Sequence, residues 1–137
     1  LVNTMGARDK ARDTKRIADL NQMGKLLSFG CYQPNSGVTS IDLAELVAEL
    51  AASNPQYIKA LGQAPQDPKT GTDLQTNYTY IVTANGNSCA LYGNLEIDDT
   101  EITLTGLSDP TPGGGQGVLQ GSVNGSNGTN IYYQVSN

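Results

Sequence analysis

Residues 4–30 contain no proline and are rich in good helix formers. Opposite charges in this stretch fall three or four residues apart, as in Asp9 with Arg12 and Lys15 with Asp19. Each such pair stabilises a helix by a few tenths of a kcal/mol, so the pattern predicts one continuous helix, about 40 Å long. Because a domain of this size needs less than that length for its core, we expect part of the helix to project.

The apolar face of this predicted helix changes character near Ile17. Its first part carries a narrow stripe of small residues, namely Ala7, Ala11, Thr14 and Ala18. Its second part carries a stripe of large residues, namely Ile17, Leu20, Met23 and Leu27. Only the second part can bury much apolar surface against the rest of the domain. The position of the change therefore favours projection over the alternative, an ordinary amphipathic helix with a solvated charged end.

After this helix, the chain is predicted to continue as a connection with short helices. A helical apolar stripe covers residues 41–52, and Thr39 with Asp42 resembles a capping box at its start. Proline at an early position then predicts a short helical segment over residues 54–61. Residues 66–72 follow Pro65 directly, contain Pro68 and Gly71, and are expected to form turns.

The remainder of the chain has the pattern of short strands. Apolar and polar residues alternate from Tyr78 to Thr83, and Asn85-Gly86 follows, which predicts a hairpin. The returning strand is expected at about Ser88–Leu95. Three further strand candidates are residues 101–105, 117–123 and 130–135. An antiparallel meander is the simplest way to connect these strands.

These elements predict a single α+β domain, in which a long N-terminal helix packs on an antiparallel β-sheet. A chain of 137 residues fits one core. The helix occupies residues 1–30, the connection with short helices occupies residues 31–77, and the sheet with its C-terminal loops occupies residues 78–137. No stretch approaches the roughly 20 apolar residues that cross a bilayer.

The chain contains two cysteines, Cys31 and Cys89, and no histidine. Their separation in sequence and the lack of histidine argue against a zinc site. A disulfide is the favoured interpretation, and it predicts an oxidising compartment outside the cytoplasm. The alternative is a pair of buried free thiols in a cytosolic protein.

Charge is divided unevenly along the chain. The first thirty residues hold six basic and three acidic residues, whereas the rest hold two basic and ten acidic ones, so the two parts carry +3 and −8. Such asymmetry is typical either of a basic arm that binds nucleic acid or of subunits that meet basic end against acidic body. The net charge of −5 argues against general affinity for nucleic acid.

Two parts of the chain resemble bacterial type IV pilins and the pseudopilins of type II secretion systems. The first is residues 7–23, with the core Arg-Asp-Thr-Lys-Arg-Ile-Ala-Asp-Leu. The second is a helix-like segment at residues 54–61, an Asp-Pro turn in residues 66–71, and the Tyr-Thr-Tyr of residues 78–80. The resemblance covers a little under half of the chain and ends at about residue 95.

The resemblance implies a hydrophobic half-helix upstream of Leu1, cleaved by prepilin peptidase, that anchors the subunit in the inner membrane before assembly. It also implies that the second half of the helix lies on the sheet. In an assembled fibre of this family the helices pack at the centre, and the globular heads cover the outside.

The expected function is therefore that of a structural subunit of a type IV pilus, with identical subunits and the pilus assembly machinery as partners. The expected location is an extracellular filament on the cell surface. One alternative within the family is a pseudopilin of a type II secretion system. The alternative from another class is a secreted binding or adhesin domain, which needs an ordinary signal peptide in place of a prepilin leader.

The basic residues of the first helix are the candidate contacts for assembly. In a fibre this surface faces neighbouring subunits, so we expect it to meet their acidic heads through Arg8, Arg12, Lys15 and Arg16. Contact with DNA phosphates is the alternative. It is disfavoured because aspartates interrupt the basic patch and no aromatic residues lie nearby for base stacking.

No catalytic motif is present, since the chain lacks histidine, a Gly-Xaa-Ser-Xaa-Gly sequence and a phosphate loop with lysine. We therefore expect neither enzyme activity nor a cofactor. The acidic run that includes Asp98, Asp99 and Glu101 offers oxygen ligands for calcium, although its spacing does not match an EF-hand. Solvated loop carboxylates are the commoner explanation for such a run.

Overall fold

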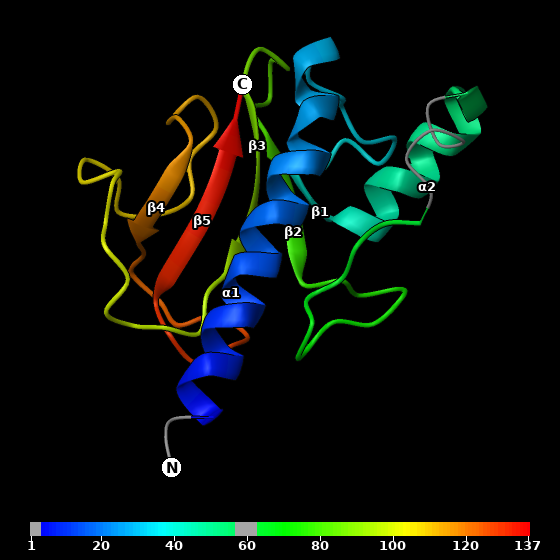
Figure 1. Ribbon diagram of the computed structural model, residues 1–137. Coiled ribbons are helices and arrows are strands. Elements are labelled where there is room, and N and C mark those ends of the chain that lie inside the picture. The colour runs from blue at the N-terminus through cyan, green and yellow to red at the C-terminus, as the bar shows by residue number, and fades with distance from the viewer. Residues whose placement is uncertain (1–3, 57–62) are drawn as a thin grey trace.

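The computed structural model describes residues 4–56 and 63–137, and it confirms the predicted α+β class. The helices are α1 (Thr4–Met23), a 3-10 helix η1 (Gly24–Phe29) and α2 (Leu43–Ser53). The strands are β1 (Ser40–Asp42), β2 (Tyr78–Val82), β3 (Cys89–Asn94), β4 (Gly117–Gln120) and β5 (Ile131–Ser136). In Figure 1, α1 lies across the sheet and its N-terminal end extends past the strands, while α2 lies to one side.

The sequence had predicted one continuous α-helix, but the first helix is not α-helical throughout. It changes to a 3-10 helix at Gly24 and ends at Gly30, whose φ of 118° favours glycine. The change coincides with a close approach to β5, because a Cβ on Gly24 would lie 2.5 Å from a methyl group of Val135. Glycine at this position therefore allows the last turns of the helix to lie directly against β5.

All five strands pair antiparallel, but their order is β1-β2-β3-β5-β4, so the predicted meander is wrong. The predicted hairpin is confirmed, with Val82 opposite Cys89. After β3 the chain crosses to the edge, forms β4, and returns through β5 between the two. The strand β1 was not predicted, because three residues directly before a helix carry too short a pattern to recognise.

The strand predicted at residues 101–105 is a loop instead. Its backbone N–H groups at Thr103 and Leu104 both donate to the carbonyl of Val118, and the Thr103 hydroxyl accepts a hydrogen bond from the Val118 N–H group. The loop thereby occupies hydrogen-bonding groups on the outer edge of β4. Covering an edge strand in this way prevents unwanted pairing with other chains.

Helix α2 begins where the sequence had suggested, but its cap differs. Asp42 is the N-cap, and its carboxylate accepts a hydrogen bond from the N–H group of Ala44 at 2.8 Å. Thr39 therefore does not cap the helix, because β1 runs up to the N-cap. The short helical segment predicted over residues 54–61 falls mostly on residues 57–62, which lie outside the described part of the chain.

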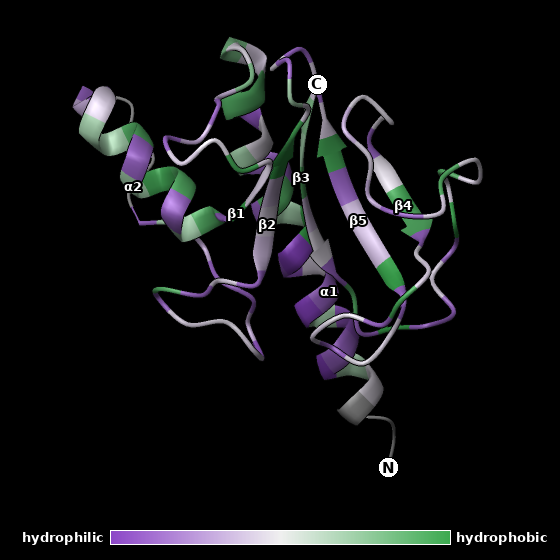
Figure 2. Cartoon of the chain, turned by 180° about the vertical axis from the view of Figure 1, so that it is seen from behind, coloured by the Kyte–Doolittle hydropathy of each residue, from purple (hydrophilic) through white to green (hydrophobic). Residues whose placement is uncertain are grey.

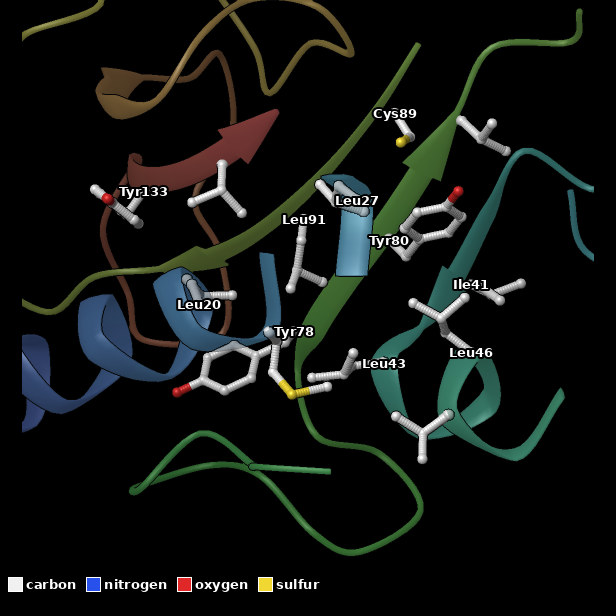
Figure 3. Packing of buried hydrophobic residues seen from close by; sticks show 14 of the residues in the cluster. Leu20, Leu27, Ile41, Leu43, Leu46, Tyr78, Tyr80, Cys89, Leu91 and Tyr133 are labelled. Carbon is white, nitrogen blue, oxygen red and sulfur yellow. The ribbon is translucent and has the colours of Figure 1, made fainter. Parts of the chain in front are cut away.

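The core forms where the large-residue stripe of α1 and η1 meets one face of the sheet. Leu20, Met23 and Leu27 are buried there, as predicted, against alternate residues of the strands. Figure 3 shows side chains of this core that come from the helix, the sheet and α2; the strand residues it labels are Ile41, Tyr78, Tyr80, Cys89, Leu91 and Tyr133. Because side chains alternate along a strand, Thr79 and Tyr92 point to the opposite face.

That opposite face is partly covered by the long loop between β3 and β4. The buried side chain of Gln134 joins β5 to this loop, since it accepts from the Thr111 N–H group and donates to the carbonyls of Thr111 and Gly115. Figure 2 shows the sheet from this side, with polar residues interrupting the apolar ones along β5. The part of the face over β1, β2 and β3 is less covered, and Thr79, Ile81 and Tyr92 are half-buried there.

Candidate functional site

Arg16 lies at the centre of a buried ion cluster that joins α1 to two loops. Its side chain is fully buried. The guanidinium group forms a two-pronged ion pair with Asp67, with Nε–Oδ2 and Nη2–Oδ1 distances of 2.8 and 3.0 Å. It also pairs with Asp13 at 2.7 Å and with Glu96 at 2.8 Å, and it donates to Asn127 Oδ1. We call these five residues the Arg16 cluster.

Asp67 is held in place by its own turn. The backbone N–H groups of Lys69 and Thr70 donate to its Oδ1 atom, and Asn127 donates to its Oδ2 atom at 2.8 Å. Gly71 permits this geometry, because a Cβ there would lie 2.5 Å from the Asp67 nitrogen. Burial alone would raise the pKa of Asp67, but the hydrogen bonds from Arg16 and Asn127 outweigh it and hold the pKa far below its usual range.

Asp13 fixes the chain that leaves β3. Its two carboxylate oxygens accept hydrogen bonds from the N–H groups of Glu96 and Ile97, at 2.8 and 3.0 Å. Glu96 in turn accepts from Arg12 and Arg16, and Arg12 also pairs with Asp9 at 2.6 Å. The charged stretch of α1 is thus bound to the rest of its own domain through polar contacts. The sequence had instead predicted a free, projecting segment.

Glu96 also contributes to the response of the network to acid. The hydrogen bond from Arg12 contributes most to lowering its pKa, burial opposes this, and Arg16 lowers it further, to about 2. The side chain is only 4% exposed. Burial alone would lower the pKa of the Arg16 guanidinium, but its partners outweigh burial and raise it, so Arg16 stays charged throughout.

We expect the free energy of unfolding to fall by at least about 2 kcal/mol between pH 6 and pH 3. A carboxyl group with a lowered pKa stabilises the fold above its unfolded-state pKa, which for Glu96 is 4.5. The contribution disappears as the pH falls from there towards 2. Urea unfolding at several pH values measures it. Glu96→Gln should make the pH dependence shallower, and a wild-type stability that is flat over this range would contradict the assignment.

The opposite side of α1 is open. Its small residues Ala7, Ala11, Thr14 and Ala18 are all exposed. We call them the small-residue face. Charged residues flank this face, with Arg8 and Lys10 exposed and Lys15 paired to Asp19 at 2.7 Å while remaining half exposed. One side of the helix is therefore anchored to the head, and the other presents a flat surface with basic margins.

The four basic residues predicted as contacts between subunits fall into two groups. Arg8 and Lys15 lie on the exposed side of α1, and their role as contacts between subunits stays a prediction. Arg16 is fully buried within its own domain, so the prediction is wrong for this residue. Arg12 also turns towards its own head, where it pairs with Glu96.

The calcium alternative gains no support from the geometry. Asp98, Asp99 and Glu101 are exposed on the loop after β3. Among residues 4–56 and 63–137, no three acidic, cysteine or histidine side chains come close enough together to hold a metal ion. The nearest acidic neighbour in sequence, Glu96, has both of its oxygens bound by arginine.

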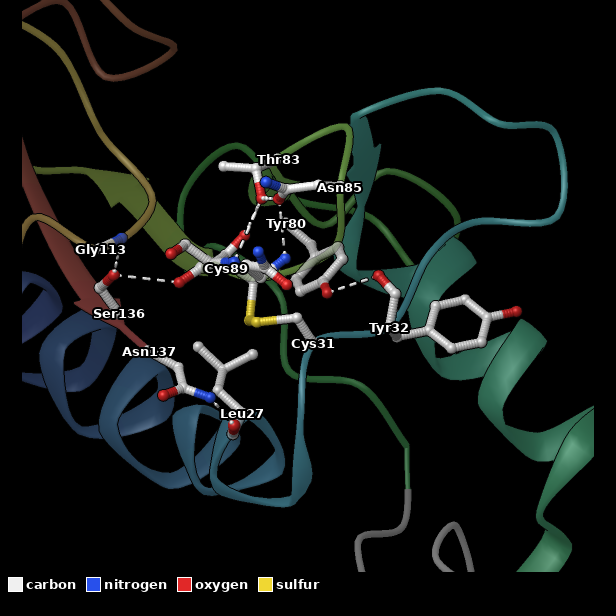
Figure 4. The surroundings of a disulfide bond; sticks show 12 residues. Leu27, Cys31, Tyr32, Tyr80, Thr83, Asn85, Cys89, Gly113, Ser136 and Asn137 are labelled. Carbon is white, nitrogen blue, oxygen red and sulfur yellow. Dashed lines mark hydrogen bonds between the residues drawn. A yellow bond between two sulfur atoms is a disulfide. The ribbon is translucent and has the colours of Figure 1, made fainter.

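The predicted disulfide between Cys31 and Cys89 is confirmed, with a Cα–Cα distance of 5.6 Å. It joins the chain after η1 to the first residue of β3 (Figure 4). The C-terminus reaches the same corner, because Asn137 and Cys89 exchange both backbone hydrogen bonds and the Asn137 side chain donates to the Leu27 carbonyl. Helix, sheet and C-terminus are thus connected at one end of the molecule.

No protein-family model, no curated protein and no solved structure matches this chain. In the part of the chain that the structure describes, no helix has the length and apolar character needed to span a membrane. The proposed function therefore depends on two features of the structure itself. These are the open side of α1 and the Arg16 cluster, which anchors the other side of this helix.

Proposed function

We propose that the chain is the head domain of a structural subunit that polymerises through α1 into a type IV pilus-like filament on the cell surface. The observation that carries this proposal is the two-sided character of α1. One side is fixed to the head by the Arg16 cluster, whereas the other exposes small residues with basic margins.

Small residues allow helices to approach one another closely, which suits a bundle of helices at the centre of a filament. A rigid anchor is needed as well, because each head must keep one orientation relative to its helix for identical contacts to repeat. The resemblance of residues 7–23 to pilins and pseudopilins agrees with this arrangement. The disulfide supports a place outside the cytoplasm.

Charge complementarity supplies the remaining argument. Arg8, Lys10 and Lys15 lie on the margins of the small-residue face, and the exposed acidic loop with Asp98 and Asp99 lies on the head. Ion pairs between these groups on neighbouring subunits would lie at the solvent-exposed rim of the interface. Such pairs favour the correct docking orientation more than they add affinity. We therefore expect filaments to dissociate more readily at high salt.

Cysteine accessibility tests the proposal directly, because the described residues contain no free cysteine. Ala11→Cys places a thiol on the small-residue face, and Ala48→Cys places a matched thiol on the exposed side of α2. Both are introduced into the complete gene product in its own cell. In filaments sheared from the surface, we expect a maleimide reagent to label Ala48→Cys fully and Ala11→Cys about tenfold less.

Both thiols should react equally in the purified, monomeric chain, which is the control for local reactivity. Absence of the chain from sheared surface material would overturn the filament proposal, and equal labelling in filaments would exclude α1 as the packing surface. Loss of protein secretion without loss of surface filaments on gene deletion would identify a secretion pseudopilin instead. A freely secreted, monomeric product would identify a separate binding domain.

A further inference from the structure

The sheet face turned away from α1 contains a groove of about 360 Å³. The register of the strands places Asp42, Thr79 and Tyr92 side by side across β1, β2 and β3. The next row along the sheet pairs Asn94 with Tyr132. The groove thus follows from the alternation of side chains, and its volume lies within the range of small-molecule sites, about 300–1,000 Å³.

Two tyrosines line the apolar part of the groove. The rings of Tyr92 and Tyr132 meet edge to face, with centroids 5.9 Å apart. Tyr132 is nearly buried, and its hydroxyl donates to the Val123 carbonyl at 2.9 Å, so this ring is held firmly. Tyr92 is half-buried and therefore presents ring surface to the groove on a rigid support.

One wall of the groove is equally well fixed. The side chain of Asn94 donates to the carbonyls of Thr129 and Ile131 and accepts from the Asn127 N–H group. Gly125 packs directly on it, because a Cβ at this glycine would lie 2.5 Å from the Asn94 side chain. The wall is thus built by close packing and would not need to rearrange when a ligand binds.

The rim of the groove offers hydrogen-bonding groups that have no partner within residues 4–56 and 63–137. These are the hydroxyl groups of Ser40, Thr79 and Tyr92. The carboxylate of Asp42 is different, because it already accepts hydrogen bonds from the N–H groups of Ala44, Thr76 and Asn77. The groups left for a ligand are therefore neutral ones.

The charges of the side chains that line the groove limit the class of ligand that it can bind. The groove lining contains no lysine and no arginine, so an anionic ligand would find no counter-charge there. A cationic ligand would find only Asp42, which is satisfied within the domain. A ligand with many neutral hydroxyl groups and an apolar C–H surface matches both the rim and the aromatic floor.

We propose that this groove binds a neutral saccharide, with an apolar face of a sugar ring against Tyr92 and its hydroxyl groups bonded to Thr79 and Ser40. The site lies on the sheet face opposite α1, so its use does not depend on how α1 packs. It is thus independent of the filament proposal, and a failure of either leaves the other standing.

Titration of the ¹⁵N-labelled chain with lactose, cellotriose and chitotriose, each to about 20 mM, tests the proposal at the weak affinities expected of an open site. We expect at least one of these probes to shift the amide signals of Thr79, Tyr92 and Gly125. Thr79→Val keeps the shape of the side chain and removes its hydroxyl, and it should weaken binding by about three- to tenfold. Tyr92→Ala should abolish binding.

Leu74→Ala is the matched control, because Leu74 is 85% exposed and lies outside the groove. The affinity of the Leu74→Ala variant for each saccharide should equal that of the wild type. The proposal is overturned if none of the three probes shifts the groove signals, if sialyllactose binds more tightly than lactose, or if Thr79→Val and Leu74→Ala bind alike. Thr79→Val keeps the test decisive even if Tyr92→Ala fails to fold.

Discussion

Replacement of Arg16 by alanine is expected to lower the free energy of unfolding by about 3–5 kcal/mol, the usual result of removing one partner from a buried ion pair. Three carboxylates, those of Asp13, Asp67 and Glu96, would lose an ion-pair partner. Water cannot readily replace it, because Arg16 and Asp67 are fully buried. The loss is a large share of the 5–15 kcal/mol typical of a folded domain.

Urea unfolding followed by circular dichroism measures this loss. Lys15→Ala is the matched control, since Lys15 is the neighbouring residue and its pair with Asp19 lies near the surface; we expect a change of at most about 0.5 kcal/mol. Arg16→Lys keeps the charge but cannot form the two-pronged pair with Asp67. Its loss of unfolding free energy should therefore lie between those of Arg16→Ala and Lys15→Ala. An effect of Arg16→Ala no larger than that of Lys15→Ala would refute the role assigned to the cluster.

Removal of the disulfide is expected to have an effect of similar size. Cys31 and Cys89 are 58 residues apart, and closing a loop of that length stabilises the fold by about 4 kcal/mol in the chain-entropy description. The double variant Cys31→Ala with Cys89→Ala avoids placing a hydroxyl group at the fully buried position of Cys89.

Unfolding with and without reductant provides the control for this variant. Reductant should lower the stability of the wild-type chain by about the same 4 kcal/mol and leave the double variant unchanged. A wild-type chain that loses less than about 1 kcal/mol on reduction would show that the folded core does not depend on this link.

The parts of the fold that the sequence predicts are those encoded by local patterns. The alternation from Tyr78 to Thr83, followed by Asn85-Gly86, identified the β2–β3 hairpin. The large-residue stripe of the first helix identified the face that packs on the sheet. The disulfide followed from the number of cysteines and the lack of histidine.

The Arg16 cluster was missed because its partners are distant in sequence. Asp67 lies 51 residues from Arg16 and Asn127 lies 111 residues away, so no local pattern joins them. One signal was nevertheless present. Asp13 and Arg16 continue the three- and four-residue spacing of Leu20, Met23 and Leu27 towards the N-terminus, which places them on the buried side of the helix. We had instead expected Arg16 to face neighbouring subunits from a projecting part of the helix.

The order of the strands was missed for a related reason. Residues 95–130 are rich in glycine, asparagine and threonine, so turn signals separate weak strand patterns that do not indicate which neighbours they pair with. The pairing depends on contacts such as those of Gln134 with Thr111 and Gly115, which become apparent only in three dimensions.

The position of β5 affects the order in which the strands can pair when the chain folds. β5 is the last of the five strands in sequence order, yet it occupies the interior of the sheet between β3 and β4. Until residues 131–136 leave the ribosome and reach their place, two neighbouring strands have no partner along facing edges. A variant that lacks residues 131–136 loses an interior strand instead of a peripheral one, so β3 and β4 keep unpaired facing edges and the sheet cannot close.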